Sequence, residues 1–310
     1  MSAPAHAQGN GSERIWTVLD LLKWTTDHFA AKGIETPRLD AELLLAHALG
    51  LRRLDLYLRY QEPVAADARA RFRELIGQRV GARVPVALLL GEKEFWSLSF
   101  SVTADVLTPR PDTETLVEAA LARLPDAERA YRVLDVGTGS GAIALALAHE
   151  KPRARITATD ISPEALEVAG RNAEALGAAD SVRFLKGDLF SPVQDELFDL
   201  IVSNPPYLAR ADAGALAPEL AHEPEQALFG GEDGYSVLRP LAEQAPDRLE
   251  PGGWLLVEVD PNQAKTVGGW FAAAGLGDGE ILKDLAGRSR AVVARKPTLS
   301  PGSEVPGRRV

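Results

Sequence analysis

Apolar residues at helical spacing characterise the first part of the chain. Near its start they recur at i, i+3, i+4 and i+7, at Ile15, Val18, Leu19 and Leu22. This spacing gives one apolar face and predicts a helix that ends at Gly33. Similar patterns predict further helices over residues 37–49, 54–58 and 64–81, the first of which opens on Thr36-Pro37. Because no strand pattern interrupts this region, we predict a small helical bundle over residues 13–84.

A strictly alternating segment follows the helices. Apolar and polar residues alternate from Trp96 to Thr103, and this period of two predicts a half-buried strand. With Val106 and Leu107 it predicts a β-hairpin, so residues 85–110 are expected to form a hairpin linker between the helical bundle and the rest of the chain. A helix is predicted next, over residues 112–124.

From Arg132 onward the pattern changes repeatedly between strand and helix. Short apolar runs predict strands at residues 133–136, 156–159, 182–185, 200–203 and 254–259, with helices at 142–150, 162–177 and 263–274. This alternation predicts an α/β domain over residues 111–297, with a mostly parallel sheet and helices on both faces. Two last strands, at 280–285 and 290–295, have a short connection and should therefore be antiparallel.

Composition restricts the chemistry that the chain can carry. Of its 310 residues 45% are hydrophobic and 25% are charged, as in an ordinary globular protein. The lack of cysteine excludes a disulfide framework and a thiol nucleophile, and the five histidines show no metal-ligand spacing, so we expect no metal site. The net charge of −10 disfavours nucleic acid as the main partner.

No apolar run approaches the length of a membrane span, and residues 1–13 lack the apolar core of a signal peptide. We therefore expect no membrane partner and a cytoplasmic location. Small and polar residues at both ends predict disordered tails over residues 1–12 and 298–310.

The motif that says most about chemistry is Asn204-Pro205-Pro206-Tyr207. It follows the predicted strand 200–203, at the carboxyl edge where open α/β sheets bind ligands. The two prolines stiffen the backbone and remove two donors. The Asn204 oxygen and the Pro205 carbonyl can accept the two hydrogens of a planar NH2 group, while the Tyr207 ring stacks on its plane. The alternative is a proline-rich turn without a ligand.

A glycine-rich loop, residues 137–141, joins the first strand of the predicted sheet to its helix. Glycines there permit a tight turn and the close approach of a ligand. Asp160 ends the next strand, where an acid commonly binds ribose hydroxyls, and Asp188 follows the third, where a carboxylate can accept from an adenine amino group. Together they predict an adenosine-containing ligand. Because no hydride-site His or Tyr-Lys pair is found, S-adenosylmethionine is favoured over a nicotinamide dinucleotide.

These motifs resemble those of the class I, S-adenosylmethionine-dependent methyltransferases. More narrowly, they resemble the HemK/PrmC family, the glutamine methyltransferases of peptide chain release factors. The matching blocks cover nearly the whole chain, at residues 37–44, 107–114, 134–141, 158–162, 203–207, 227–234 and 283–288. The resemblance implies a Rossmann-like methyltransferase sheet with an antiparallel last strand, and a helical domain that helps to hold the release factor.

The resemblance also implies the reaction, which is methyl transfer from S-adenosylmethionine to the side-chain amide nitrogen of the glutamine in the Gly-Gly-Gln loop of a release factor. The catalytic residues that it implies are Asn204, Pro205, Pro206 and Tyr207. The cofactor-binding residues that it implies are Gly137, Thr138, Gly139, Ser140, Gly141, Asp160, Asp188, Leu189 and Asn204.

Three positions need separate mention. Asp260-Pro261 stands where a glycine turn is expected, and Leu189 stands where some relatives place an aromatic residue against adenine. Arg110 is expected either to neutralise the donor carboxylate or to brace its loop, or else to form a structural salt bridge.

Other functions remain open on the sequence. The acceptor of the methyl group could instead be a glutamine of a large-subunit ribosomal protein, although the block at 109–114 favours the release factor. Methylation of adenine N6 in DNA would use the same NH2 clamp, but that enzyme needs a basic, aromatic-rich recognition segment, which this chain lacks. A non-catalytic adenosine-binding module would be favoured by loss of Asn204 or of the glycine loop, and both are intact.

Overall fold

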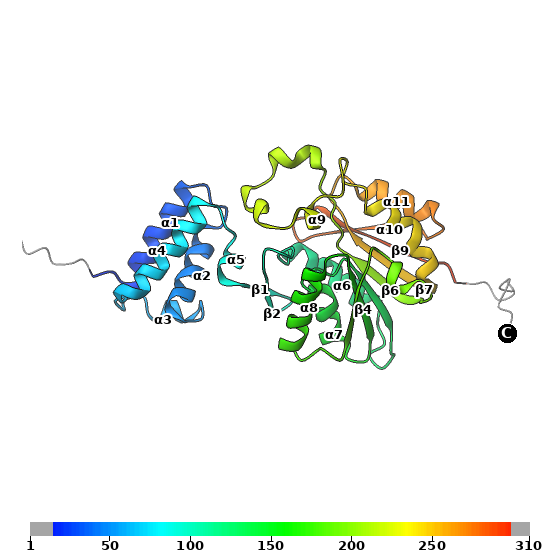
Figure 1. Ribbon diagram of the computed structural model, residues 1–310, viewed down its shortest axis with the longest axis horizontal. Helices are drawn as coiled ribbons and strands as arrows, with labels where there is room; N and C mark the ends of the chain where they lie inside the picture. The colour runs from blue at the N-terminus through cyan, green and yellow to red at the C-terminus, as the bar shows by residue number, and fades with distance from the viewer. Residues whose placement is uncertain (1–14, 299–310) are drawn as a thin grey trace, which may run out of the picture. The chain divides into compact units, whose positions relative to one another are not determined.

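The computed structural model describes residues 15–298 and divides into two compact units, residues 1–90 and 91–310 (Figure 1). The predicted tails, residues 1–12 and all but the first residue of 298–310, lie outside the described residues. The boundary falls between Leu90 and Gly91, so the segment predicted as a linker is shared between the two units.

The first unit is built from helices, as predicted. They are α1 (Val18–Ala31), α2 (Pro37–Leu49), α3 (Asp55–Leu58), α4 (Ala66–Gly81) and α5 (Val86–Leu90). Helix α1 begins later than its apolar pattern suggested, because Thr17 accepts a hydrogen bond from the Asp20 N–H while Asp20 accepts one from the Thr17 N–H. Ile15 therefore precedes the helix and is exposed. Helix α5 was missed, since residues 86–90 were included in the predicted hairpin.

The hairpin exists, but its strands differ from the prediction. Strand β1 (Glu92–Phe95) pairs with β2 (Leu98–Ser101), and Trp96 and Ser97 form the turn. Both turn residues have positive φ, 52° and 58°, which suits the right-handed twist of a two-residue hairpin. The alternation from Trp96 to Thr103 therefore spans a turn and one strand, and Val106 and Leu107 lie outside any strand.

The second unit contains a seven-stranded sheet within the described residues, with the order β5-β4-β3-β6-β7-β9-β8. Its strands are β3 (Arg132–Val136), β4 (Arg155–Asp160), β5 (Val182–Lys186), β6 (Phe198–Ser203), β7 (Leu249–Glu258), β8 (Glu280–Lys283) and β9 (Ser289–Arg295). The first five are mutually parallel, whereas β9 is antiparallel to both β7 and β8, as predicted.

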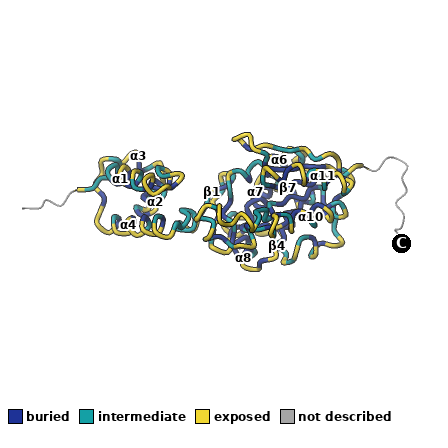
Figure 2. The backbone as a smooth tube through the Cα atoms, turned by 90° about the horizontal axis from the view of Figure 1, so that it is seen from above, coloured by how far each residue is buried: buried dark blue, intermediate teal, exposed yellow. Residues whose placement is uncertain are grey.

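Helices cover both faces of this sheet, and the side chains of each strand alternate between two apolar clusters. One cluster receives Val133, Leu200 and Leu256 and lies under the helices α6 (Glu114–Ala122), α7 (Ala142–Glu150) and α8 (Pro163–Ala175). The other receives Leu134 and Ile201 and lies under α10 (Leu238–Gln244) and α11 (Ala264–Ala273). In Figure 2 the tube near the β7 label is coloured as buried. This packing fixes the strand ends that carry the site.

Between β6 and β7 the sequence predicted no element, yet the chain is ordered there. It forms short 3-10 turns at η3 (Arg210–Ala215) and η4 (Pro218–His222), then α9 (Glu225–Leu228) and α10. The 3-10 turn η5 (Ala245–Arg248) follows α10 in the same region, and η2 (Ser191–Val193) lies between β5 and β6. The predicted helix 112–124 begins as a 3-10 turn, η1 (Pro111–Thr113), before α6.

Candidate functional site

The glycine loop and the Asn-Pro-Pro-Tyr motif begin at the same level of the sheet. Strands β3 and β6 are parallel neighbours, and their last residues, Val136 and Ser203, are paired in register. The buried Ser203 hydroxyl donates a hydrogen bond to the Val136 carbonyl at 2.7 Å. The chain continues from β3 to β4 and β5 on one side, then crosses to β6 on the other side of β3. The edge between β3 and β6 is therefore the switch point at which open α/β sheets bind ligands.

The glycine loop takes a conformation that requires its glycines. Gly137, Gly139 and Gly141 have φ of 73°, 57° and 83°, in the left-handed region that side chains rarely adopt. At Gly141 a Cβ would also approach Leu145 to 3.0 Å and Ala169 to 3.2 Å, so this residue permits close packing of α7 on α8.

Most backbone donors of this loop are already used inside the fold. The Gly137 and Thr138 N–H groups both bond the Thr159 carbonyl, and the Gly141 N–H bonds the Thr138 carbonyl. A dinucleotide needs such groups for its pyrophosphate. Their use within the loop therefore favours the S-adenosylmethionine alternative that the sequence suggested.

Asp135 supports the loop from below. Its carboxyl is fully buried and accepts hydrogen bonds from the Thr138 hydroxyl at 2.7 Å and from the Ala144 N–H at 3.2 Å. Burial raises its pKa to about 7, against the opposing effect of these two donors. Asp135 thus ties the loop to the first turn of α7.

The two predicted acids lie at the ends of neighbouring strands. Each Asp160 oxygen accepts one backbone N–H, from Gly139 at 2.8 Å and from Ser162 at 2.9 Å, which leaves further lone pairs for ribose hydroxyls. Burial raises the pKa of Asp160. Asp188 is exposed, and the following Leu189 has a φ of 46°, a strained conformation for a residue with a side chain.

These residues surround one cavity of about 330 Å³. The predicted residues that line it are Gly137, Thr138, Gly139, Ser140, Asp160, Asp188, Leu189, Asn204, Pro205 and Pro206. Gly141 and Tyr207 are not part of the wall. The structure therefore joins the glycine loop, both acids and the start of the Asn-Pro-Pro-Tyr motif around a single space.

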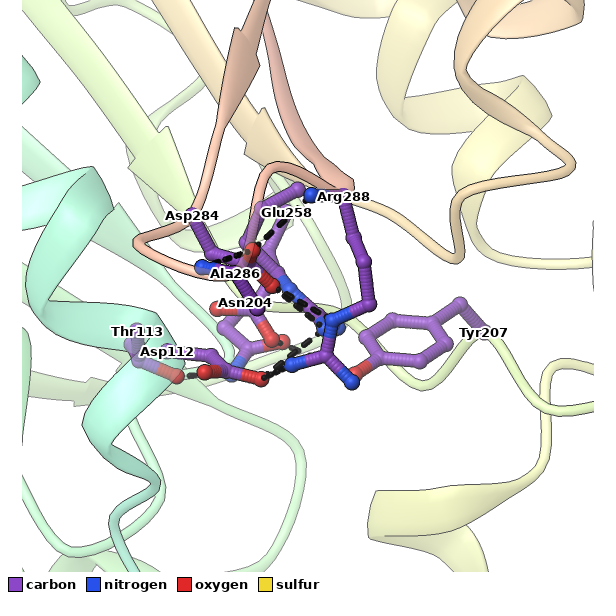
Figure 3. A network of polar contacts seen from close by, with 9 residues as sticks. Asp112, Thr113, Asn204, Tyr207, Glu258, Asp284, Ala286 and Arg288 are labelled. Atoms are coloured by element: carbon purple, nitrogen blue, oxygen red, sulfur yellow. Dashed lines mark hydrogen bonds and ion pairs between the residues drawn. The ribbon is translucent and has the colours of Figure 1, made fainter.

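Asn204 is oriented by a residue that the sequence did not single out. Its Nδ2 atom donates a hydrogen bond to the Thr113 hydroxyl at 3.1 Å, so its Oδ1 atom remains available as an acceptor (Figure 3). Thr113 ends the 3-10 turn η1 and is 4% exposed. This orientation agrees with the predicted role of the Asn204 oxygen.

Tyr207 is held at both ends. Its hydroxyl donates to Glu258 Oε1 at 3.2 Å, and its backbone carbonyl accepts from Gln263 Nε2 at 2.9 Å. Burial raises the pKa of the Tyr207 hydroxyl above its usual range. Gln263 Oε1 also accepts a hydrogen bond from the Asp260 N–H, so the Gln263 side chain links the Asp260-Pro261 turn to the motif. Asp260 does not have a positive φ, so this turn does not require the glycine that was expected there.

The block 227–234 packs directly against the motif. A Cβ on Gly230 would lie 2.5 Å from the Pro206 carbonyl oxygen, and a Cβ on Gly234 would lie 2.8 Å from Gln263 Nε2. Leu208 exchanges backbone hydrogen bonds with this block, donating to Leu228 and accepting from Gly230. These glycines allow the two loops to approach each other closely.

Arg110 lines the cavity and also forms an ion pair. Its guanidinium donates to Glu223 at 2.5 Å, and the Glu223 side chain is 1% exposed. Glu223 also accepts from the Thr108 N–H at 3.3 Å. The structure shows the salt bridge that was one of the roles expected for Arg110.

Sequence reasoning missed an ionic network behind the motif, in which Arg290 and Asp284 are buried and Arg288 is exposed. Arg290 and Arg288 both pair with Asp112, at 2.8 and 3.1 Å, and both pair with Asp284. Figure 3 shows Arg288 between Asp112 and Asp284. These residues fall in the blocks 107–114 and 283–288 or beside them. The acidic and basic residues in these segments could have indicated ion pairs. Only the fold, however, shows that the two segments lie together.

Comparison with known proteins identifies both units. The family model described as PrmC N-terminal domain matches residues 20–91, and that described as Methyltransferase small domain matches residues 113–233. A release factor glutamine methyltransferase of Geobacter sulfurreducens is 46% identical over 91% of this chain and 97% of its own. One of Deinococcus radiodurans is also 46% identical, over 89% of this chain and 98% of its own.

A solved ribosomal RNA methyltransferase of T. thermophilus, in complex with AdoMet and guanosine, is 22% identical. It covers 66% of this chain and 49% of its own, with a TM-score of 0.50, so this likeness concerns the fold alone. Between residues 15 and 298, no helix has the length and apolar character that crossing a membrane requires.

Proposed function

Since this chain belongs to the release factor glutamine methyltransferase family, we propose that its Asn-Pro-Pro-Tyr motif holds the glutamine side chain of a release factor against the methyl group of S-adenosylmethionine. The enzyme is a protein-(glutamine-N5) methyltransferase that depends on S-adenosylmethionine. We assign the acceptor to the glutamine of the Gly-Gly-Gln loop, as the motif suits a planar amide.

The cavity suits the methyl donor. Its volume lies in the range of small-molecule sites, and its lining combines an open glycine backbone with two carboxylates on adjacent strand ends. We propose that Asp160 accepts from the ribose hydroxyls and that Asp188 accepts from the adenine amino group, with Leu189 packing on the ring. A Cβ on Gly137 or Gly139 would meet no atom within 4 Å, so the backbone is accessible there.

The residues of the motif activate a weak nucleophile. When bound, S-adenosylmethionine supplies an electrophilic methyl group on a positively charged sulfur. The Asn204 Oδ1 atom and the Pro205 carbonyl accept the two N–H groups of the glutamine, which returns electron density to its nitrogen and aims its lone pair. Held by Asn204 and Pro205, the glutamine nitrogen would take the methyl carbon, the electron pair of the broken carbon–sulfur bond would stay with the donor, and the acidified N–H proton would leave to solvent. Tyr207 supports the amide plane.

One observation carries this proposal, which is the hydrogen bond from Asn204 Nδ2 to Thr113. It leaves Oδ1 available as an acceptor on a residue that lines the cavity proposed to hold the donor. The opposite amide orientation would present a donor and would repel an NH2 group.

The test is transfer of labelled methyl from S-adenosylmethionine to a purified release factor, with its Gly-Gly-Gln glutamine intact or changed to alanine. Label should appear on the intact factor alone. The Asn204→Ala variant should lose most turnover, by about 100-fold or more, and still bind the donor. Near-normal turnover by this variant would refute the clamp assignment, and absence of label on the intact factor would refute the substrate.

Three wider assignments rest on the same proposal. Residues 13–84 would recognise the release factor, and residues 111–297 would carry out methyl transfer. The net charge of −10 supports a protein as the substrate, with no direct contact to nucleic acid. Because release factors act in translation, we place the enzyme in the cytoplasm.

A further inference from the structure

We propose that Phe229 supplies the aromatic face on which the side chain of the acceptor glutamine packs. Phe229 would then touch the acceptor itself, so this assignment rests on the proposed function and deepens it. Two aromatic residues lie close to the prolines of the motif, Tyr207 and Phe229. Of these two, Phe229 lines the cavity and Tyr207 does not.

The Tyr207 ring lies behind the motif rather than in the cavity wall. Its hydroxyl donates to Glu258 and points into the polar network of Figure 3. The ring itself packs against the apolar cluster that lies under α10 and α11. Tyr207 can therefore support the amide plane only through the backbone of the motif, and the aromatic contact that the sequence assigned to its ring needs another residue.

Phe229 is held beside the motif by backbone hydrogen bonds. Leu208 donates to the Leu228 carbonyl and accepts from the Gly230 N–H, each at 3.0 Å. These two bonds flank Phe229, which forms a parallel bridge with Leu208. The glycine at position 230 allows this approach, because a Cβ there would lie 2.5 Å from the Pro206 carbonyl oxygen. Phe229 therefore lines the cavity next to the motif.

Packing in the core does not account for the Phe229 ring. Phe229 is half-buried and belongs to none of the three apolar clusters found within residues 15–298. A large apolar side chain that stays partly in water forgoes the stabilisation that burial would give. A flat apolar surface in a cavity wall is, however, well suited to a ligand, because aromatic rings pack on planar groups. The aliphatic stem and planar amide of a glutamine side chain match such a surface.

A guanidinium group stabilises the ring from outside the cavity. The Arg210 Cζ atom lies over the Phe229 ring, 5.0 Å from its centroid, and Arg210 does not line the cavity. Arg210 is itself held by Glu225 at 3.0 Å and by its backbone N–H, which donates to the Gly231 carbonyl at 2.9 Å. This cation–π contact restricts the ring, so the acceptor meets a surface that is already formed.

The direct test is a double-mutant cycle between enzyme and substrate, measured as binding. Enzyme saturated with S-adenosylhomocysteine is titrated with release factor whose Gly-Gly-Gln glutamine is intact or changed to alanine. In the wild type the glutamine should tighten binding by about 10-fold, and in Phe229→Leu by about threefold or less. An equal advantage from the glutamine in both enzymes would overturn the proposal.

Steady-state kinetics provide a second readout. Phe229→Leu should lower kcat/KM for release factor by about 10-fold, with the Kd for S-adenosylmethionine within about twofold of wild type. Phe229→Tyr, which keeps the ring, should retain most of kcat/KM. A Kd for S-adenosylmethionine that rises as much as kcat/KM falls would place Phe229 in the donor half of the cavity and contradict the proposal.

Two arginines offer a matched comparison. Arg210→Gln removes the cation from the Phe229 ring and should lower kcat/KM by about threefold. Arg239 lies over the Trp270 ring at 4.9 Å in the same way, but neither of these residues lines the cavity, so Arg239→Gln should leave kcat/KM unchanged. An equal loss in both arginine variants would contradict the role of the Phe229 ring.

Failure of this assignment differs from failure of the proposed function. If the wild type transfers label to the glutamine and the cycle shows no coupling with Phe229, the proposed function stands and the role of Phe229 is refuted. If no label reaches the intact factor, the substrate assignment and the role of Phe229 are refuted together.

Discussion

The close packing of the block 227–234 on the Asn-Pro-Pro-Tyr motif can be tested with three glycine-to-alanine changes. Gly230 has an ordinary φ, but a Cβ there would overlap the Pro206 carbonyl oxygen at 2.5 Å. Gly275 has the reverse properties, with a φ of 82° and no atom within 4 Å of a Cβ. Gly234 combines a φ of 81° with a contact of 2.8 Å to Gln263. The three variants thus separate the effect of a left-handed backbone conformation from the effect of steric overlap between the new Cβ and its neighbours.

The expected magnitudes differ in stability and in activity. Gly275→Ala should lower the free energy of unfolding by about 1 kcal/mol, the cost of a left-handed alanine. Gly230→Ala should lower it by about 2 kcal/mol through overlap, and Gly234→Ala by about 3 kcal/mol through both effects. Because the overlap displaces the peptide that follows the Pro205 carbonyl, Gly230→Ala should also lower kcat by about 100-fold, whereas Gly275→Ala should not.

Denaturant unfolding would measure the first quantity, and labelled methyl transfer to release factor the second. Both should be measured at a temperature where all variants remain folded. If Gly230→Ala kept wild-type kcat, or if Gly275→Ala lost as much activity as Gly230→Ala, the claim that this block positions the motif would be wrong.

Three further outcomes follow from other parts of the sheet unit. The raised pKa of Asp135 means that the folded state binds the carboxyl proton more tightly than the unfolded state does. The free energy of unfolding should therefore fall as pH rises from about 4 to about 7, by up to about 4 kcal/mol. In denaturant titrations, the Asp135→Asn variant should lack this fall. Arg110→Ala should destabilise the protein by about 2 kcal/mol because it leaves the buried Glu223 without its cation, and a Glu223→Gln background should reduce that loss. Ser97→Gly should raise the unfolding free energy by roughly 1 kcal/mol, since it relieves a positive φ at an exposed turn, and a lower melting temperature would contradict the assigned turn.

Local patterns predicted most of the elements because each depends on neighbours in sequence. The helix 142–150 and the capped start at Ser162 are cases in which spacing and cap chemistry agree with the structure. The alternation from Trp96 to Thr103 led to a wrong prediction of one continuous strand. Trp96 and Ser97 form a two-residue turn, and a turn of this length does not interrupt the alternation of apolar and polar residues. Polarity alone cannot distinguish a strand from a strand joined to such a turn.

Some residues of the candidate site could be predicted from the sequence and others could not. Residues on the strand ends were identifiable, since parallel strands bring their carboxyl ends to one edge. Thr113, Glu258 and Arg290 were not, because their partners lie tens of residues away and their roles depend on burial and hydrogen-bond direction. The region 207–248 was also missed, since its order comes from packing on the motif and from close glycine contacts.

The pairing of Val136 with Ser203 has a consequence for divergence within the family. The loop on the donor side and the loop on the acceptor side leave the sheet from adjacent strands, whose separation of about 4.8 Å is set by backbone hydrogen bonds. In the proposed function, the distance between the methyl donor and its acceptor is therefore anchored by main-chain geometry, which most side-chain substitutions do not alter. More than half of the aligned residues differ between this chain and the Geobacter sulfurreducens relative, and we expect substitutions at such positions to leave the spacing of the two loops in this chain unchanged.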